Sequence, residues 1–123
     1  MRSALAPLFV LLASPALAAE PQPILDGAWT VDLSADPAKP YTKPMTLTLK
    51  PDGMVAGSFY ESEIQAGRWK TDRGRTCVSF RTLDGGGGPY HSAACLVKDH
   101  VEGQTWAENR NFLFNWNATR AKP

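Results

Sequence analysis

Two cysteines placed symmetrically about a run of glycines constrain the fold of this chain more than any other feature. Cys77 and Cys95 are equidistant from Gly86, which lies within four consecutive glycines. The segments on both sides are rich in residues that favour strands. Folding the chain back at the glycines therefore sets the two cysteines opposite each other. We predict a β-hairpin with a disulfide between its strands.

The same pairing predicts which face of the hairpin points inward. Side chains alternate between the two faces of a strand, so Val78 and Phe80 lie on the face away from Cys77. That face is the more apolar one. We expect it to line the interior and the disulfide to lie on the outer wall.

Residues 1–18 have the composition of a secretory signal peptide. Arg2 supplies positive charge, an apolar run follows at residues 5–13, and Ala16-Leu17-Ala18 is a small-x-small cleavage signature. The apolar run is far shorter than the roughly 20 residues that a membrane-spanning helix needs. We expect export to the periplasm or outside the cell, where a disulfide forms and persists.

The rest of the chain has the size of one domain. We predict a loose leader at residues 19–25, a single β-barrel domain at 26–120 and a tail at 121–123. The sequence has 13 basic and 12 acidic residues, and loss of Arg2 leaves 12 of each sign (13 − 1 = 12). Because no long run of one charge exists, we expect neither nucleic acid nor a membrane as a partner, and we expect a monomer.

Alternating apolar and polar residues predict eight short strands and no helix. The predicted strands span residues 29–33, 45–50, 54–60, 64–70, 76–83, 89–98, 101–108 and 112–117. A long loop with three prolines occupies residues 34–44. The turn Pro51-Asp52-Gly53 sets Leu47 against Gly57, on a face that we expect to be buried.

Eight short strands joined mostly by tight turns predict an all-β fold. We predict an antiparallel up-and-down eight-stranded barrel, in which the first strand closes on the last and removes both exposed edges. A Greek-key β-sandwich is the alternative.

Gly27-x-Trp29, the long first loop, the meandering strands and the late Arg120 together resemble lipocalin-like (calycin) barrels. In that family an arginine near the end of the last strand packs over the tryptophan of the first, so the resemblance implies that Arg120 covers Trp29. The three residues after Arg120 are too few for the C-terminal helix of lipocalins. The chain therefore also resembles avidin-like barrels and small bacterial periplasmic inhibitor barrels.

Aromatic residues dominate the predicted inner faces. The set comprises Trp29, Phe59, Trp69, Phe80, Phe112, Phe114 and Trp116, and Trp106 is expected to join it. Eight strands leave an interior just wide enough for side chains, so these rings either plug the barrel or line a pocket of at least about 300 Å³.

These two interpretations give two functions. The leading one is an exported protein that binds a small apolar or planar ligand. The residues expected to contact that ligand are Tyr41, Trp69, Phe80, Trp106, Phe114 and Trp116. The alternative is a plugged barrel that binds a protein, as a protease inhibitor does.

The sequence offers little for catalysis. Arg81, Asp84 and His91 flank the glycines at residues 85–88 and suit either a small anion or an ordinary hairpin tip, which we favour. No phosphate-loop signature follows the glycines. His91 and His100 lack the spacing of metal ligands, and no nucleophile elbow is present. We expect no metal, no cofactor and no enzymatic activity, with an enzyme as the least favoured alternative.

Overall fold

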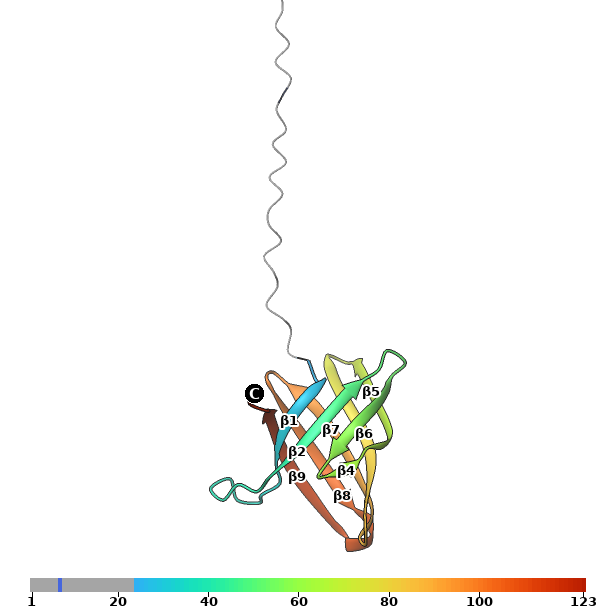
Figure 1. Ribbon diagram of the computed structural model, residues 1–123. Coiled ribbons are helices and arrows are strands. Elements are labelled where there is room, and N and C mark those ends of the chain that lie inside the picture. The colour runs from blue at the N-terminus through green and yellow to red at the C-terminus, as the bar shows by residue number, and fades with distance from the viewer. Residues whose placement is uncertain (1–6, 8–23) are drawn as a thin grey trace, which may run out of the picture.

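A computed structural model of the chain describes residue 7 and residues 24–123 (Figure 1). The predicted signal peptide, apart from residue 7, and most of the predicted leader lie outside the described residues. Within the part that is described, no helix is long and apolar enough to cross a membrane.

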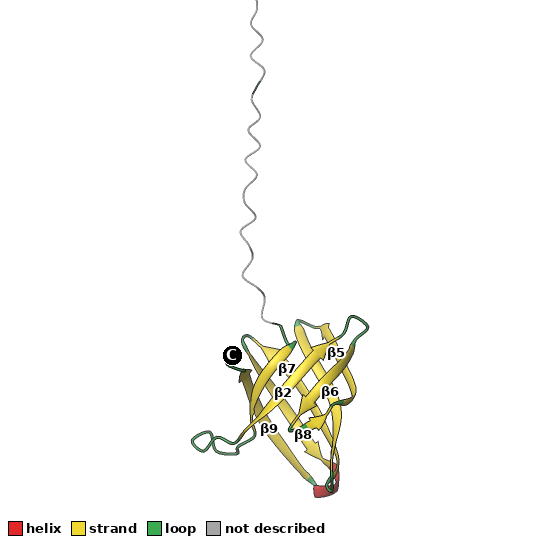
Figure 2. Cartoon of the chain, viewed as in Figure 1, coloured by secondary structure: helices red, strands yellow, loops and turns green. Residues whose placement is uncertain are grey.

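Strands account for almost all of the domain, with a single short 3-10 helix (Figure 2). In chain order the elements are β1 (Gly27–Asp32), β2 (Thr42–Leu49), β3 (Met54–Phe59), β4 (Ser62–Glu63), β5 (Gln65–Asp72), β6 (Arg75–Asp84), β7 (Gly88–Val97), β8 (His100–Ala107), η1 (Glu108–Arg110) and β9 (Phe112–Arg120).

The strands form a closed eight-stranded antiparallel barrel, as predicted from the sequence. Apart from the short β4, each strand pairs with the strands next to it in the chain, and β1 pairs with both β2 and β9. The two-residue β4 and the longer β5 both pair with β3, so together they act as one strand interrupted at Ile64. Closure leaves a single continuous sheet, which excludes the Greek-key sandwich.

The first hairpin has the predicted register. Leu47 pairs with Gly57 and Met45 with Phe59. Leu47 is 2% exposed, whereas Thr46 and Thr48 on the other face are exposed. The turn works because Gly53 adopts a φ of 88°, which a residue without a side chain tolerates well.

The central hairpin is also confirmed. Cys77 pairs with Cys95, and the two form a disulfide. Val78 and Phe80 are buried, with 2% and 4% of their surface exposed, so the disulfide lies on the outer wall as expected.

Closure of the barrel brings the two ends of the domain together (Figure 1). Arg120 pairs with Trp29 across β9 and β1, and the guanidinium carbon lies 4.0 Å from the centre of the indole ring. The Trp29 Nε1 donates a hydrogen bond of 2.9 Å to the carbonyl of Leu25, which is only 1% exposed. The packed domain therefore begins at Leu25, the last residue of the segment predicted to be loose.

Several predicted boundaries are displaced, including the end of the last strand, which continues to Arg120. The turn predicted at 61–63 is instead formed by Tyr60 and Glu61, with φ values of 51° and 64°. The long loop ends earlier than predicted because β2 already begins at Thr42. Pro44 is accepted within this strand because β3 begins to pair with β2 only at Met45, so on that side no ladder hydrogen bond is lost. The strand predicted from residue 101 starts at His100.

Candidate functional site

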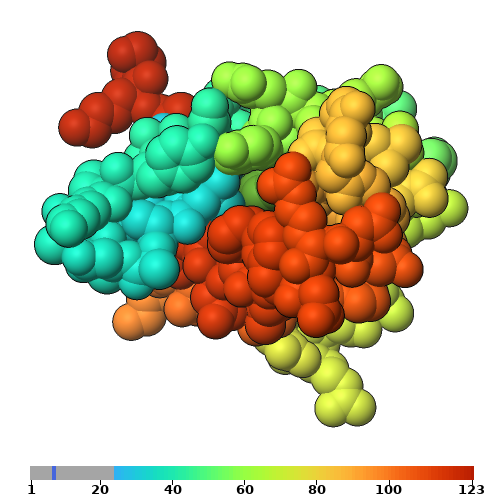
Figure 3. Space-filling model, turned by 90° about the horizontal axis from the view of Figure 1, so that it is seen from below, coloured from blue at the N-terminus to red at the C-terminus, as the bar shows by residue number. Residues whose placement is uncertain are grey.

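The barrel is filled at the end that holds the termini and hollow at the other. A cavity of about 270 Å³ opens at the end where the β1–β2 loop, the Tyr60 turn, the glycine loop and η1 converge (Figure 3). Its lining consists of Leu33, Tyr41, Phe59, Tyr60, Ser62, Thr82, Asp84, Tyr90, Thr105, Arg110, Phe112 and Phe114. Six of these twelve residues carry an aromatic ring, so the cavity has an apolar wall with polar groups near its opening.

A buried hydrogen-bonded group forms the floor of the cavity. The Trp116 Nε1 donates to the Thr105 hydroxyl at 2.9 Å, and the Thr105 and Ser92 hydroxyls are 2.8 Å apart. The ring of Phe59 packs against Phe80 and Trp116, with centroid distances of 5.4 and 5.2 Å. These buried polar groups satisfy one another, and with Phe59 they mark the boundary between the filled half and the hollow half.

The position of Trp116 depends on a missing side chain. Gly103 lies directly opposite Trp116 on β8. A Cβ atom added at Gly103 would overlap the indole ring. The indole therefore packs flat against the backbone of β8, which leaves the space above it open.

The walls are made by the last strand and its neighbours. Phe112 and Phe114 contact each other edge to face, with centroids 4.6 Å apart. Both side chains are only half-buried, which indicates that their rings face the cavity. Thr82 supplies a buried polar group between them and the glycine loop.

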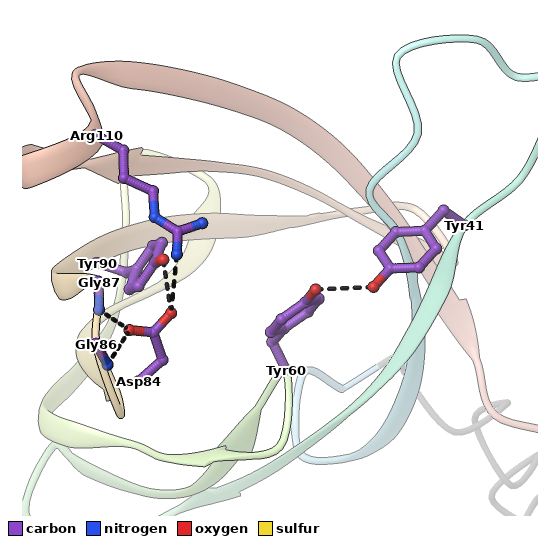
Figure 4. A network of polar contacts seen from close by, with 7 residues as sticks. All are labelled: Tyr41, Tyr60, Asp84, Gly86, Gly87, Tyr90 and Arg110. Carbon is purple, nitrogen blue, oxygen red and sulfur yellow. Dashed lines mark hydrogen bonds and ion pairs between the residues drawn. The ribbon is translucent and has the colours of Figure 1, made fainter.

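One side of the opening is formed by two tyrosines. The hydroxyls of Tyr41 and Tyr60 are 2.8 Å apart (Figure 4). Lys43 Nζ lies 5.2 Å from the Tyr60 ring centre. The hydrogen bond with Tyr41, aided by burial, raises the pKa of Tyr60. Like any tyrosine hydroxyl, that of Tyr60 can both donate and accept a hydrogen bond.

The other side of the opening is organised by Asp84 (Figure 4). Its carboxylate accepts hydrogen bonds from the Tyr90 hydroxyl at 2.7 Å and from the backbone N–H groups of Gly86 and Gly87. Arg110 Nη2 lies 3.9 Å from it. These contacts, the Tyr90 bond foremost, lower the pKa of Asp84, whereas burial and the Asp84 bond raise the pKa of Tyr90.

The cluster predicted around the glycine loop is split between the two faces of the wall. Asp84 lines the cavity, whereas Arg81 and His91 lie on the outer face. Arg81 donates to the Gln65 side chain at 3.1 Å, and His91 Nε2 lies 3.1 Å from Glu108. The three residues therefore do not form one anion site.

Of the six residues predicted to contact a ligand, Tyr41 and Phe114 line the cavity. Trp116 is buried as part of the floor, and the buried Phe80 packs against the floor residue Phe59. Trp69 lies toward the filled end, where its Nε1 donates to the carbonyl of Lys50 at 2.7 Å.

Trp106 lies on the outer wall, 48% exposed, with its ring centre 5.5 Å from that of His91. The expectation that it joins the inward aromatic set is wrong, because Thr105 and Ala107 take the inward positions of β8 and are buried.

Sequence reasoning missed Tyr60, Tyr90 and Arg110 as parts of the site. Strand alternation places Tyr90 on the inner face, so that signal was available. Tyr60 and Arg110 lie in a turn and in η1, where no periodic pattern indicates direction.

No group of three or more histidine, cysteine or acidic residues in the described part of the chain is placed to hold a metal ion. Comparison of the chain with protein-family models, with curated proteins and with solved structures gave no significant match.

Proposed function

We propose that this protein is an exported, non-catalytic binding protein that holds a small planar ligand in the open end of its barrel. The observation that carries the proposal is the cavity of about 270 Å³ with its six aromatic rings. Such a lining suits a flat apolar body, and the few polar groups at the opening suit recognition of one substituent.

The volume points to a ligand of one or two fused rings. Pockets for drug-sized ligands have volumes from about 300 Å³ upward, and this cavity lies just below that range. The closed floor of Phe59, Thr105 and Trp116 prevents a longer ligand from passing deeper into the barrel.

Two further parts of the proposal rest on separate support. The signal-like residues 1–18 and the disulfide between Cys77 and Cys95 support export to an oxidising compartment. The Arg120–Trp29 contact at the closure point supports a place among the calycin-like barrels.

A second function, binding of a protein partner, is favoured by one feature of the outer wall. Trp106 and Leu113 pair across β8 and β9 and are 48% and 56% exposed. Exposed aromatic and aliphatic residues side by side are typical of interaction surfaces.

The first test is titration of the protein, purified with its disulfide intact, with the neutral probe methyl 2-naphthoate, monitored by calorimetry. We expect one site per chain. A Ser62→Trp variant, which fills the opening, should abolish binding, whereas Ser79→Trp on the outer wall should not. Absence of binding to the unaltered protein, or equal loss in both variants, would contradict the proposal. Native mass spectrometry of protein from its own compartment would then reveal the retained ligand itself.

A further inference from the structure

We infer that the ligand of the open end is an aromatic carboxylate, with its ring between the cavity walls and its carboxylate held by Arg110 and the Tyr41–Tyr60 pair. This inference rests on the proposed function and adds the chemical class of the ligand. It follows from the hydrogen-bonding capacity that the side chains at the opening leave unused.

The acidic group of the site is already occupied. Asp84 accepts hydrogen bonds from Tyr90 and from the N–H groups of Gly86 and Gly87, and it pairs with Arg110. Both carboxylate oxygens are therefore engaged within the protein. A cationic ligand would have to displace these contacts, so Asp84 acts as a support for the glycine loop and for Arg110 rather than as a receptor for positive charge.

The basic group has unused donors. A guanidinium carries five N–H donors, and among the described residues the only ion pair of Arg110 is the 3.9 Å contact with Asp84. Its side chain is 54% exposed and lies over the ring of Tyr90, with the guanidinium carbon 5.9 Å from the ring centre. Arg110 can therefore present a planar pair of N–H groups to a carboxylate and still remain near Asp84.

The opposite side of the opening also offers a donor. In the Tyr41–Tyr60 pair, one hydroxyl donates to the other, which leaves one proton free. Lys43, whose Nζ lies 5.7 and 5.2 Å from the two ring centres, adds positive charge behind the pair, shared with Glu61 at 3.5 Å. Figure 4 shows the two tyrosines and the Arg110 group on opposite sides of the opening.

An acceptor-only group thus matches both sides. A carboxylate accepts hydrogen bonds with two oxygens and donates none, and a ring attached to it would extend past the paired rings of Phe112 and Phe114 toward the floor. An ammonium group would meet the positive charges of Arg110 and Lys43, and the carboxylate in the cavity lining, Asp84, is already engaged within the protein.

The test compares three probes that share one ring system: 2-naphthoate, methyl 2-naphthoate and 2-naphthylmethylammonium. For a charge-assisted contact of about 1.4 kcal/mol, we expect the carboxylate to bind about tenfold more tightly than the ester. We expect the ammonium to bind more weakly than either. Arg110→Gln should lower the affinity for the carboxylate more than that for the ester, so that their ratio falls toward one. Arg73→Gln, in a distant turn, is the matched control and should leave the ratio unchanged.

A second variant covers the other side of the opening. Tyr60→Phe removes a hydroxyl and keeps the ring, and it should also lower the ratio of carboxylate to ester affinity. If the ester binds as tightly as the carboxylate, or if neither variant changes the ratio, the inference is wrong while the proposed function stands. If none of the three probes binds, the proposed function fails and the inference fails with it.

Discussion

The Arg120 side chain joins three separate features at the point where the barrel closes. Its guanidinium carbon lies 4.0 Å from the centre of the Trp29 ring, and its N–H groups donate to the carbonyls of Asp26 and Ile24. One side chain therefore fixes the entering segment, the first strand and the last strand together.

Arg120→Ala should lower the free energy of unfolding by about 1–3 kcal/mol, since it removes both a cation–π contact and charge-assisted hydrogen bonds. Arg73→Ala, in an exposed turn, is the control and should change it by less than about 0.5 kcal/mol. Urea titrations of the three proteins measure the difference. Equal stability of the two variants would contradict the role assigned to Arg120.

Loss of the Cys77–Cys95 disulfide should destabilise the fold without changing its topology. The two residues are 18 positions apart, and closing a loop of this size contributes about 3 kcal/mol in the chain-entropy model. A Cys77→Ala/Cys95→Ala double variant should show this loss in a guanidinium titration. Reductant should destabilise the unaltered protein and leave the double variant unaffected; an effect of reductant on the variant would contradict the explanation.

Leu47→Ala should cost about 2–5 kcal/mol because it leaves a void at a fully buried position. Its neighbour Thr48 points to solvent, so Thr48→Ala should cost well under about 1 kcal/mol. Thermal unfolding monitored by circular dichroism ranks the two variants, and similar losses would show that the inward face of β2 has been assigned wrongly.

Asp84 should make stability depend on pH in the acid range. Because the folded-state pKa lies below the ordinary value of 3.8, the unfolded chain binds the proton more tightly. The stabilisation is therefore fully present above pH 3.8 and is lost as the pH falls through the lower folded value. The free energy of unfolding should differ between the unaltered protein and Asp84→Asn by a constant amount near neutral pH. This difference should shrink below pH 3.8.

Asp32 also has a lowered pKa, chiefly because it accepts a hydrogen bond from the backbone N–H of Ser34. Asp32 is present in both the unaltered protein and Asp84→Asn, so its contribution cancels in the difference between their free energies of unfolding. Asp72→Asn, at the other end of the barrel, serves as a control for the loss of one negative charge. A difference that stays flat through the acid range would contradict the network drawn around Asp84.

Gly103→Ala should disturb the cavity floor from the opposite strand. The added methyl group would overlap the Trp116 ring, so the indole must tilt and weaken its bond to Thr105. We expect a loss of about 1–3 kcal/mol, as for other overpacked sites, together with weaker binding of methyl 2-naphthoate. Gly85→Ala, where an added Cβ meets nothing within 4 Å, is the control.

The pairing of strands could be predicted because strong local signals specify it. The symmetry of the cysteines about Gly86 and the alternation on both sides of Asp52 each determine a register without any knowledge of the remaining strands. The closure of β1 on β9 followed because no other edges remained. These inferences use only the period of the strand and the chemistry of the turn.

The site was less predictable because it depends on positions that carry no such signal. Tyr60 and Glu61 turn the chain with positive φ values, although neither is a residue that favours them. The direction of Arg110 depends on how η1 ends. The cavity itself depends on how the strands are staggered around the barrel. This stagger places Trp116 in the floor and Phe114 in the wall, and it leaves the space above Trp116 open.

The uneven filling of the barrel separates the residues that hold the fold from those that face the opening. Leu25, Trp29 and Leu47 lie at the end with the termini, whereas the rim is built by loops and by half-exposed rings. Substitutions of the rim rings should therefore change the shape and polarity of the opening without touching the packed end of the barrel. Such a layout makes the barrel a practical starting scaffold for libraries in which only the mouth is randomised.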